Sequence, residues 1–241
     1  MTLLDEVISA YGGRDRWEQL TSITIHQNIG GTLWARKGVE GVLDGATVEI
    51  EPGHQRTWHR PLPTAGLRSS YSPELVRIET DDDAVTVIEE LPSPRESFAG
   101  HTAVTPWTTL QLAYFAGFAM WTYLSEPYSL TLPGVHTEEL GPWREDGHTW
   151  RRLGIQFPDS IATQSAEQTV YIDADGLIQR RDYTAELLGS SLTAHYSAGH
   201  QEFDGIVVAT RRAAYRRGSD NAIVSGSEPL VTIDIDNVVV K

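Results

Sequence analysis

The stretch PWTTLQLAYFAGFAMWTYLSEP, residues 106–127, is the segment on which the fold of this chain depends. Six of its side chains are aromatic, although the chain as a whole is strongly acidic. Its uncharged core, residues 110–124, is about 15 residues long, whereas a membrane-spanning helix needs about 20. We therefore expect a buried helix at about 107–125, ending at or before Pro127 because the residue before a proline disfavours helical backbone.

Plotted at 100° per residue, this helix has two different sides. The bulky side carries Trp107, Leu110, Tyr114, Phe115, Phe118 and Trp121, with Gln111 near its middle. The other side carries mostly small residues: Leu112, Ala113, Ala116, Ala119, Met120 and Tyr123. Two interpretations stay open: the helix fills the core of a large sheet, or its bulky side lines a pocket for an apolar ligand. In the second, Gln111 is a polar anchor and the candidate ligand-binding residues are Trp107, Gln111, Tyr114, Phe115, Phe118 and Trp121.

On both sides of the helix the sequence has the alternating pattern and turn signals of β-strands. The candidate strands are 22–38, 41–51, 53–60, 74–80, 84–90, 135–141, 148–157, 164–173, 178–187, 191–203, 206–217 and 229–240. Tight turns, such as 81–83 and 173–176, join them into an antiparallel meander. Two short helices precede the first strand, and a capping box at Thr2 and Asp5 begins the first of them.

These elements predict an α+β fold in a single domain, residues 1–241. We expect a strongly curved antiparallel sheet of about eleven strands, a half-open β-barrel. N-terminal helices precede this sheet, and the apolar helix at about 107–125 closes its open side.

Several stretches of the sequence resemble the LolA/LppX-like superfamily of lipoprotein-carrier domains. The N-terminal part, LLDEVISAYGGRDRWEQLTSITI, is similar to the start of these domains, and YIDADGLIQRRDY and VTIDIDNVVV are similar to their closing hairpins. The whole chain is also similar to a family of uncharacterised bacterial proteins of about this length. The resemblance implies a half-open barrel with a helical lid and a hydrophobic cavity.

Composition limits the partners of this chain. With 19 Lys and Arg against 33 Asp and Glu, the net charge is −14, which argues against nucleic-acid binding, since that needs clustered cations. The chain has no cysteine, so disulfides and thiolate metal sites are excluded. No signal peptide is visible at the N-terminus, so the expected location is the cytoplasm. We expect a small hydrophobic molecule as partner, with no membrane span; the oligomeric state stays open.

No complete catalytic motif occurs in the sequence, and we expect neither a metal site nor a cofactor. The candidate catalytic residues are isolated groups that strand parity could place in a cavity: His101, His26, His195 and Asp182. On one predicted strand, Arg181 shares a face with Tyr183, and Asp182 shares the other face with Arg180.

Three functions follow as alternatives. The first is a cytoplasmic protein that binds a small hydrophobic molecule between the sheet and the apolar helix. The second is a cofactor-free isomerase, cyclase, lyase or hydrolase that uses the same cavity for His and carboxylate acid–base chemistry on an apolar metabolite. The third is a structural or interaction module, which predicts no cavity and a large exposed apolar patch.

Overall fold

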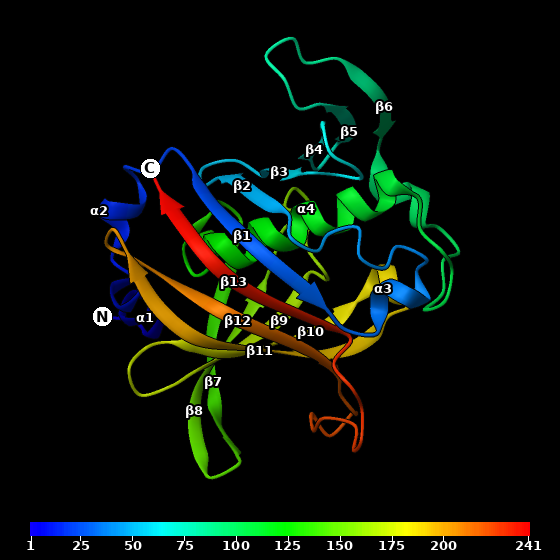
Figure 1. The fold of residues 1–241 in the computed structure, drawn as a ribbon. Helices are drawn as coiled ribbons and strands as arrows, with labels where there is room; N and C mark the ends of the chain where they lie inside the picture. Colours follow the sequence, from blue (N-terminus) through cyan, green and yellow to red (C-terminus); the bar gives the residue numbers. More distant parts are fainter.

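A single curved antiparallel sheet dominates the computed structural model, which describes residues 1–241 (Figure 1). The strands lie in the order β6-β5-β4-β3-β2-β1-β13-β12-β11-β10-β9-β8-β7. The first and last strands pair with each other, so both lie in the middle of the sheet. The sheet does not close, since β6 and β7 remain its two edges.

The bounds of the elements are as follows. The strands are β1 Ile23–Gly30, β2 Thr47–Glu51, β3 Arg56–Arg60, β4 Leu67–Ser72, β5 Leu75–Thr80, β6 Val87–Pro92, β7 His136–Glu145, β8 His148–Gln156, β9 Glu167–Ile172, β10 Ile178–Ala185, β11 Ser191–Phe203, β12 Ile206–Arg216 and β13 Val231–Val240. The α-helices are α1 Leu3–Ala10, α2 Arg14–Trp17, α3 Leu33–Arg36 and α4 Thr109–Ser125. Three short 3₁₀ helices are η1 Pro94–Phe98, η2 Tyr128–Thr131 and η3 Glu186–Leu188.

The expected curved antiparallel sheet is therefore present, but its thirteen strands correct the expected number of about eleven. Strand β4 was missed because serine occupies several of its positions, and the buried Ser69 weakens the apolar alternation. The strand expected at 22–38 ends at Gly30 and is followed by α3. Gly31 ends it with a φ of 105°, and a Cβ there would lie 2.4 Å from the Leu230 carbonyl oxygen.

Helix α4 confirms the buried apolar helix expected at about 107–125. Its N-terminus has a capping box, in which Thr108 Oγ1 accepts a bond from Gln111 N (3.2 Å) and Gln111 Oε1 accepts one from Thr108 N (3.0 Å). Every residue from Gln111 to Ser125 is buried. None of the helices combines the length and apolar character needed to cross a bilayer.

One side of α4 packs closely on the N-terminal half of the sheet, inside its curve (Figure 1). The contact is centred on Gly117, whose missing side chain leaves room for the buried ring of Tyr71. Thr57 Oγ1 donates to the Gly117 carbonyl (2.9 Å), and Trp121 Nε1 donates to the Glu51 carbonyl (3.1 Å). These contacts fix the bulky side of the helix against β2, β3 and β4.

Replacing Gly117 with alanine is expected to destabilise the protein, although alanine is the better helix former. The new Cβ would lie 2.4–2.8 Å from Tyr71 ring and Cβ atoms, which cannot move freely. Overpacking of this kind costs about 1–3 kcal/mol, against a gain in helix propensity of about 1 kcal/mol. Chemical denaturation should show a net loss of up to about 2 kcal/mol. Gly53→Ala is the control, since a Cβ there meets nothing within 4 Å, and a stabilised Gly117→Ala variant would contradict the packing described.

Candidate ligand-binding cavity

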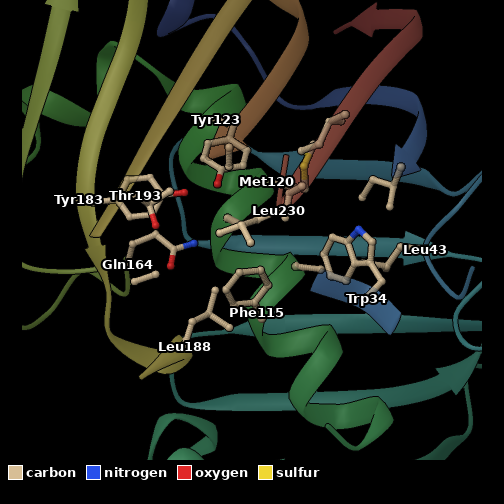
Figure 2. A pocket seen from close by; sticks show the side chains of 17 residues that line it. Trp34, Leu43, Phe115, Met120, Tyr123, Gln164, Tyr183, Leu188, Thr193 and Leu230 are labelled. Carbon is tan, nitrogen blue, oxygen red and sulfur yellow. The ribbon is translucent and has the colours of Figure 1, made fainter. Parts of the chain in front are cut away.

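An apolar cavity, here called the α4 cavity, lies between α4 and the inner face of the C-terminal half of the sheet (Figure 2). It is lined by Ile29, Trp34, Leu43, Phe115, Ala116, Ala119, Met120, Tyr123, Gln164, Tyr183, Ala185, Leu188, Thr193, Ala214, Leu230, Val231 and Ile233. Fifteen of these 17 residues are hydrophobic. The lining therefore suits an apolar guest.

The cavity exists because the small side of α4 faces it. Ala116 and Ala119 point toward β12 and β13, where Ala214 is also small, so none of these side chains fills the space. Most of the bulky side packs on the N-terminal strands instead, and only Phe115 of that side lines the cavity. Gly117 lets the bulky side approach the sheet closely at Tyr71, so mainly the alanine side faces the cavity.

The α4 cavity is narrow in this conformation. Its cavity volume is only about 30 Å³. That space admits a few waters at most. A larger apolar ligand would therefore have to displace side chains, and Met120, which has a long flexible side chain, is suited to such movement.

The two ends of the cavity differ in polarity. Figure 2 shows Trp34 and Leu43 on one side and Tyr123, Tyr183, Gln164 and Thr193 grouped on the other. Burial raises the pKa of the Tyr183 hydroxyl well above 10, and burial likewise raises that of Tyr123. Both phenols therefore stay protonated near neutral pH and can donate hydrogen bonds.

A buried charge cluster lies beside this polar end. Arg181 Nε donates to Glu126 Oε1 at 3.0 Å, and Arg212 Nη1 lies 3.6 Å from Glu126 Oε2. Arg181 Nη1 also donates to Gln168 Oε1 (2.6 Å), and Arg212 Nη2 donates to the Tyr123 carbonyl (3.0 Å). All three charged side chains are at most 4% exposed. The cluster joins the end of α4 to β10 and β12.

The segment 158–166, which carries Gln164, crosses from the C-terminal strands to the N-terminal half of the molecule. Gln55 holds it with two bonds to Ala162: Nε2 donates to the carbonyl (2.9 Å), and Oε1 accepts from the amide (2.9 Å). Arg95 Nη1 donates to the Thr163 carbonyl (3.1 Å). This segment therefore covers the cavity at the position of Gln164.

Replacing Gln55 with alanine is expected to loosen segment 158–166 without unfolding the sheet. Both side-chain bonds to Ala162 are lost, so the Ala162 amide should open more easily to solvent. Hydrogen–deuterium exchange should show faster exchange within 158–166 and unchanged exchange in β10 to β12. The exposed Gln201→Ala is the control, and equal exchange in both variants would contradict this role of Gln55.

The residues expected to bind ligand lie in different places. Phe115 lines the α4 cavity, and Tyr114 lines a separate surface hollow beside Arg95 and segment 158–163. Trp107 and Phe118 are buried against the Phe115 ring, and Trp121 is buried with its bond to the Glu51 carbonyl. Gln111 already donates through Nε2 to the Ser97 carbonyl (3.0 Å) besides its capping bonds. Contact of these residues with a ligand stays a prediction.

The structure does not bring the candidate catalytic residues together. His26 forms an exposed pair with Asp236 (2.7 Å), and His101 packs on Phe98 near η1. Asp182 lies on the face of β10 opposite to the cavity, in an ion pair with Arg180 (2.6 Å). Only His195 lies beside the α4 cavity, with its ring 4.5 Å from that of Tyr123.

Strand parity correctly assigns Arg181 and Tyr183 to one face of β10 and Arg180 and Asp182 to the other. The lining itself contains two phenols but no carboxylate and no imidazole. Sequence reasoning did not find Glu126 and Arg212. The available signal was a carboxylate directly after an apolar helix, in a chain whose later strands carry paired arginines.

Comparison with solved structures places this chain among proteins with the LolA-like fold. It superposes on a DUF1329 family protein from Desulfovibrio piger with a TM-score of 0.51 and 14% identity, over 98% of this chain and 90% of that one. It superposes on a LolA superfamily protein from Nitrosomonas europaea with a TM-score of 0.52 and 8% identity, over 98% and 90%. The fold is therefore the LolA-like half-barrel that the sequence resemblance implied.

A third similar structure is a domain from Vibrio parahaemolyticus assigned to outer-membrane lipoprotein sorting. Its TM-score is 0.52 at 9% identity, over 99% of this chain and 91% of that one. The sequence of the present chain matches no protein-family model, and no curated protein sequence is detectably similar to it. At sequence identities of 8% to 14%, structural similarity establishes the fold alone.

Proposed function

We propose that this protein binds a small hydrophobic molecule in the α4 cavity. The observation that carries the proposal is the lining, in which 15 of 17 residues are hydrophobic and the small residues of α4 leave space. The assignment of the similar Vibrio parahaemolyticus domain to lipoprotein sorting supports an apolar guest in a half-barrel of this kind. The cytoplasmic location expected from the sequence stays a prediction.

Ligand binding explains features that the two alternatives do not. An acid–base enzyme needs at least two suitable titratable groups within reach of one ligand, whereas the lining offers only the two protonated phenols. A structural or interaction module predicts no cavity, whereas a narrow apolar cavity lies behind α4. A cavity bordered by Ala116, Ala119 and Ala214 is instead suited to receive a guest.

Replacing Ala119 with leucine is expected to weaken ligand binding at least tenfold. The larger side chain enters the cavity from α4 and occupies space that the guest needs. The measurement is titration with N-phenyl-1-naphthylamine, a neutral dye that fluoresces in apolar surroundings. Ala84→Leu is the matched control, because Ala84 is exposed in the turn between β5 and β6 and does not line the cavity.

Thermal melting of both variants should show that the fold is retained. Equal dye affinity in wild-type protein and Ala119→Leu would contradict binding in the α4 cavity. Wild-type protein that binds neither this dye nor any alkyl chain would contradict the proposed function itself.

A further inference from the structure

The inner face of the sheet beside the α4 cavity carries a buried net positive charge. Arg181 and Arg212 contribute two positive charges, and Glu126 is the only carboxylate that contacts them. Their neighbour His195 adds no charge at neutral pH, because burial and then the two arginines lower its pKa well below 6.5. The cluster therefore has a charge of about +1 in a place without solvent, where an unpaired charge is costly.

This charge lies directly next to the cavity lining. In the strand register, Arg181 pairs with His195, which pairs with the lining residue Ala214. Arg212 pairs in the same way with the lining residue Ile233. Arg212 is thus one strand, and Arg181 two strands, away from a residue that lines the cavity.

Two buried nitrogen atoms of this group have no hydrogen-bond partner. They are Arg212 Nε and His195 Nδ1, in side chains that belong to residues only 6% and 2% exposed. Buried polar groups are normally satisfied, so each orphan calls for an explanation. An additional acceptor near the Arg212 Nε–H group is one explanation for that orphan.

Hydrogen-bond donors occupy the boundary between the charge and the cavity. The Tyr123 ring contacts both His195 (4.5 Å between ring centres) and the Arg212 guanidinium (5.0 Å to the ring centre). Tyr183 lies on the same face as Arg181, and the Gln164 amide nitrogen points into the cavity (Figure 2). Two phenols and one amide therefore line this end of the cavity.

We propose that the α4 cavity selects apolar ligands with an anionic end group, a carboxylate, which Tyr123, Tyr183 and Gln164 bind beside the arginine pair. The inference rests on the proposed function and names its ligand class. A carboxylate of charge −1 would bring the total of cluster and ligand to about zero. A neutral end group would leave the positive charge as it is, and an ammonium group would raise it to about +2.

The test compares three ligands that share one alkyl chain: dodecanoate, methyl dodecanoate and dodecylammonium. Each displaces N-phenyl-1-naphthylamine from wild-type protein at pH 7.5. We expect dodecanoate to bind at least tenfold more tightly than the methyl ester, and dodecylammonium to bind most weakly. Tighter or equal binding of the ester would overturn the inference and leave the proposed function standing. Absence of binding by the dye and all three ligands would overturn both.

Variants of the cavity residues then show where the carboxylate of dodecanoate binds. Tyr183→Phe removes one hydroxyl and keeps the ring, so it should lower dodecanoate affinity at least fivefold and leave the ester unchanged. Tyr215→Phe is the matched control, since the Tyr215 ring packs on Tyr196 and does not line the cavity. Gln164→Leu provides a second variant should Tyr183→Phe fail to fold. Unchanged selectivity in both cavity variants would show that the carboxylate binds elsewhere, and would overturn the inference.

Discussion

Replacing Glu126 with glutamine is expected to lower the free energy of unfolding by about 3–5 kcal/mol, the usual cost of removing one partner from a buried ion pair. Glu126 is 4% exposed and is the carboxylate between Arg181 and Arg212. Its loss leaves two buried guanidinium groups without a counter-charge. Urea denaturation at pH 7.5 measures the effect.

The control for this variant is Glu186→Gln. Glu186 also pairs with an arginine, Arg95, but the two side chains are 46% and 39% exposed, and exposed pairs contribute about 0–1 kcal/mol. A double variant, Glu126→Gln with Arg181→Met, should lose less stability than the sum of its two single variants. Equal losses in Glu126→Gln and Glu186→Gln would contradict the account of the buried cluster.

Lowering the pH from 7.5 to 5 is expected to cost about 2 kcal/mol of stability through His59 alone. His59 lies on β3 with no exposed surface, and neither ring nitrogen has a hydrogen-bond partner. Burial lowers the pKa of this imidazole from 6.5 to about 3. Between these two values the unfolded chain binds a proton that the folded protein excludes, so stability is complete above about pH 6.5 and falls as the pH is lowered.

The variant His59→Leu isolates this contribution. Its loss of unfolding free energy between pH 7.5 and 5 should be about 2 kcal/mol smaller than that of the wild-type protein. His148→Leu, at an exposed position on β8, should leave the pH dependence as it is. An identical pH dependence in wild-type protein and His59→Leu would show that His59 is not held neutral by burial.

The sequence was sufficient for the architecture because its strongest signals are local. The apolar helix followed from the length of the uncharged run at 110–124, which is too short for a membrane and too apolar for a surface. The meander followed from tight turns such as 173–176, where Asp173 Oδ1 accepts bonds from two backbone amides. Strand β4 was missed because its alternation is carried by small polar residues such as Ser69.

The cavity was less predictable because it depends on which side of α4 approaches which strands. A helical wheel separates the bulky side from the alanine side, but it does not contain Tyr71, whose contact with Gly117 decides the orientation. The charge cluster is equally non-local, since Glu126 meets Arg181 and Arg212 only after distant strands assemble. Parity along β10 put Arg181 and Tyr183 on one face, but it did not show that this face points inward or that Glu126 is the partner of Arg181.

The most direct test of the account is ¹⁹F NMR of protein labelled with 5-fluorotryptophan. Trp34 lines the α4 cavity, whereas Trp143 and Trp150 lie on the β7–β8 hairpin away from it. The resonance that is missing from the spectrum of Trp34→Phe is the Trp34 resonance. Addition of dodecanoate should shift or broaden the Trp34 resonance and leave those of Trp143 and Trp150 unchanged. Binding that leaves the Trp34 resonance unmoved and shifts the hairpin resonances would contradict a guest in the α4 cavity.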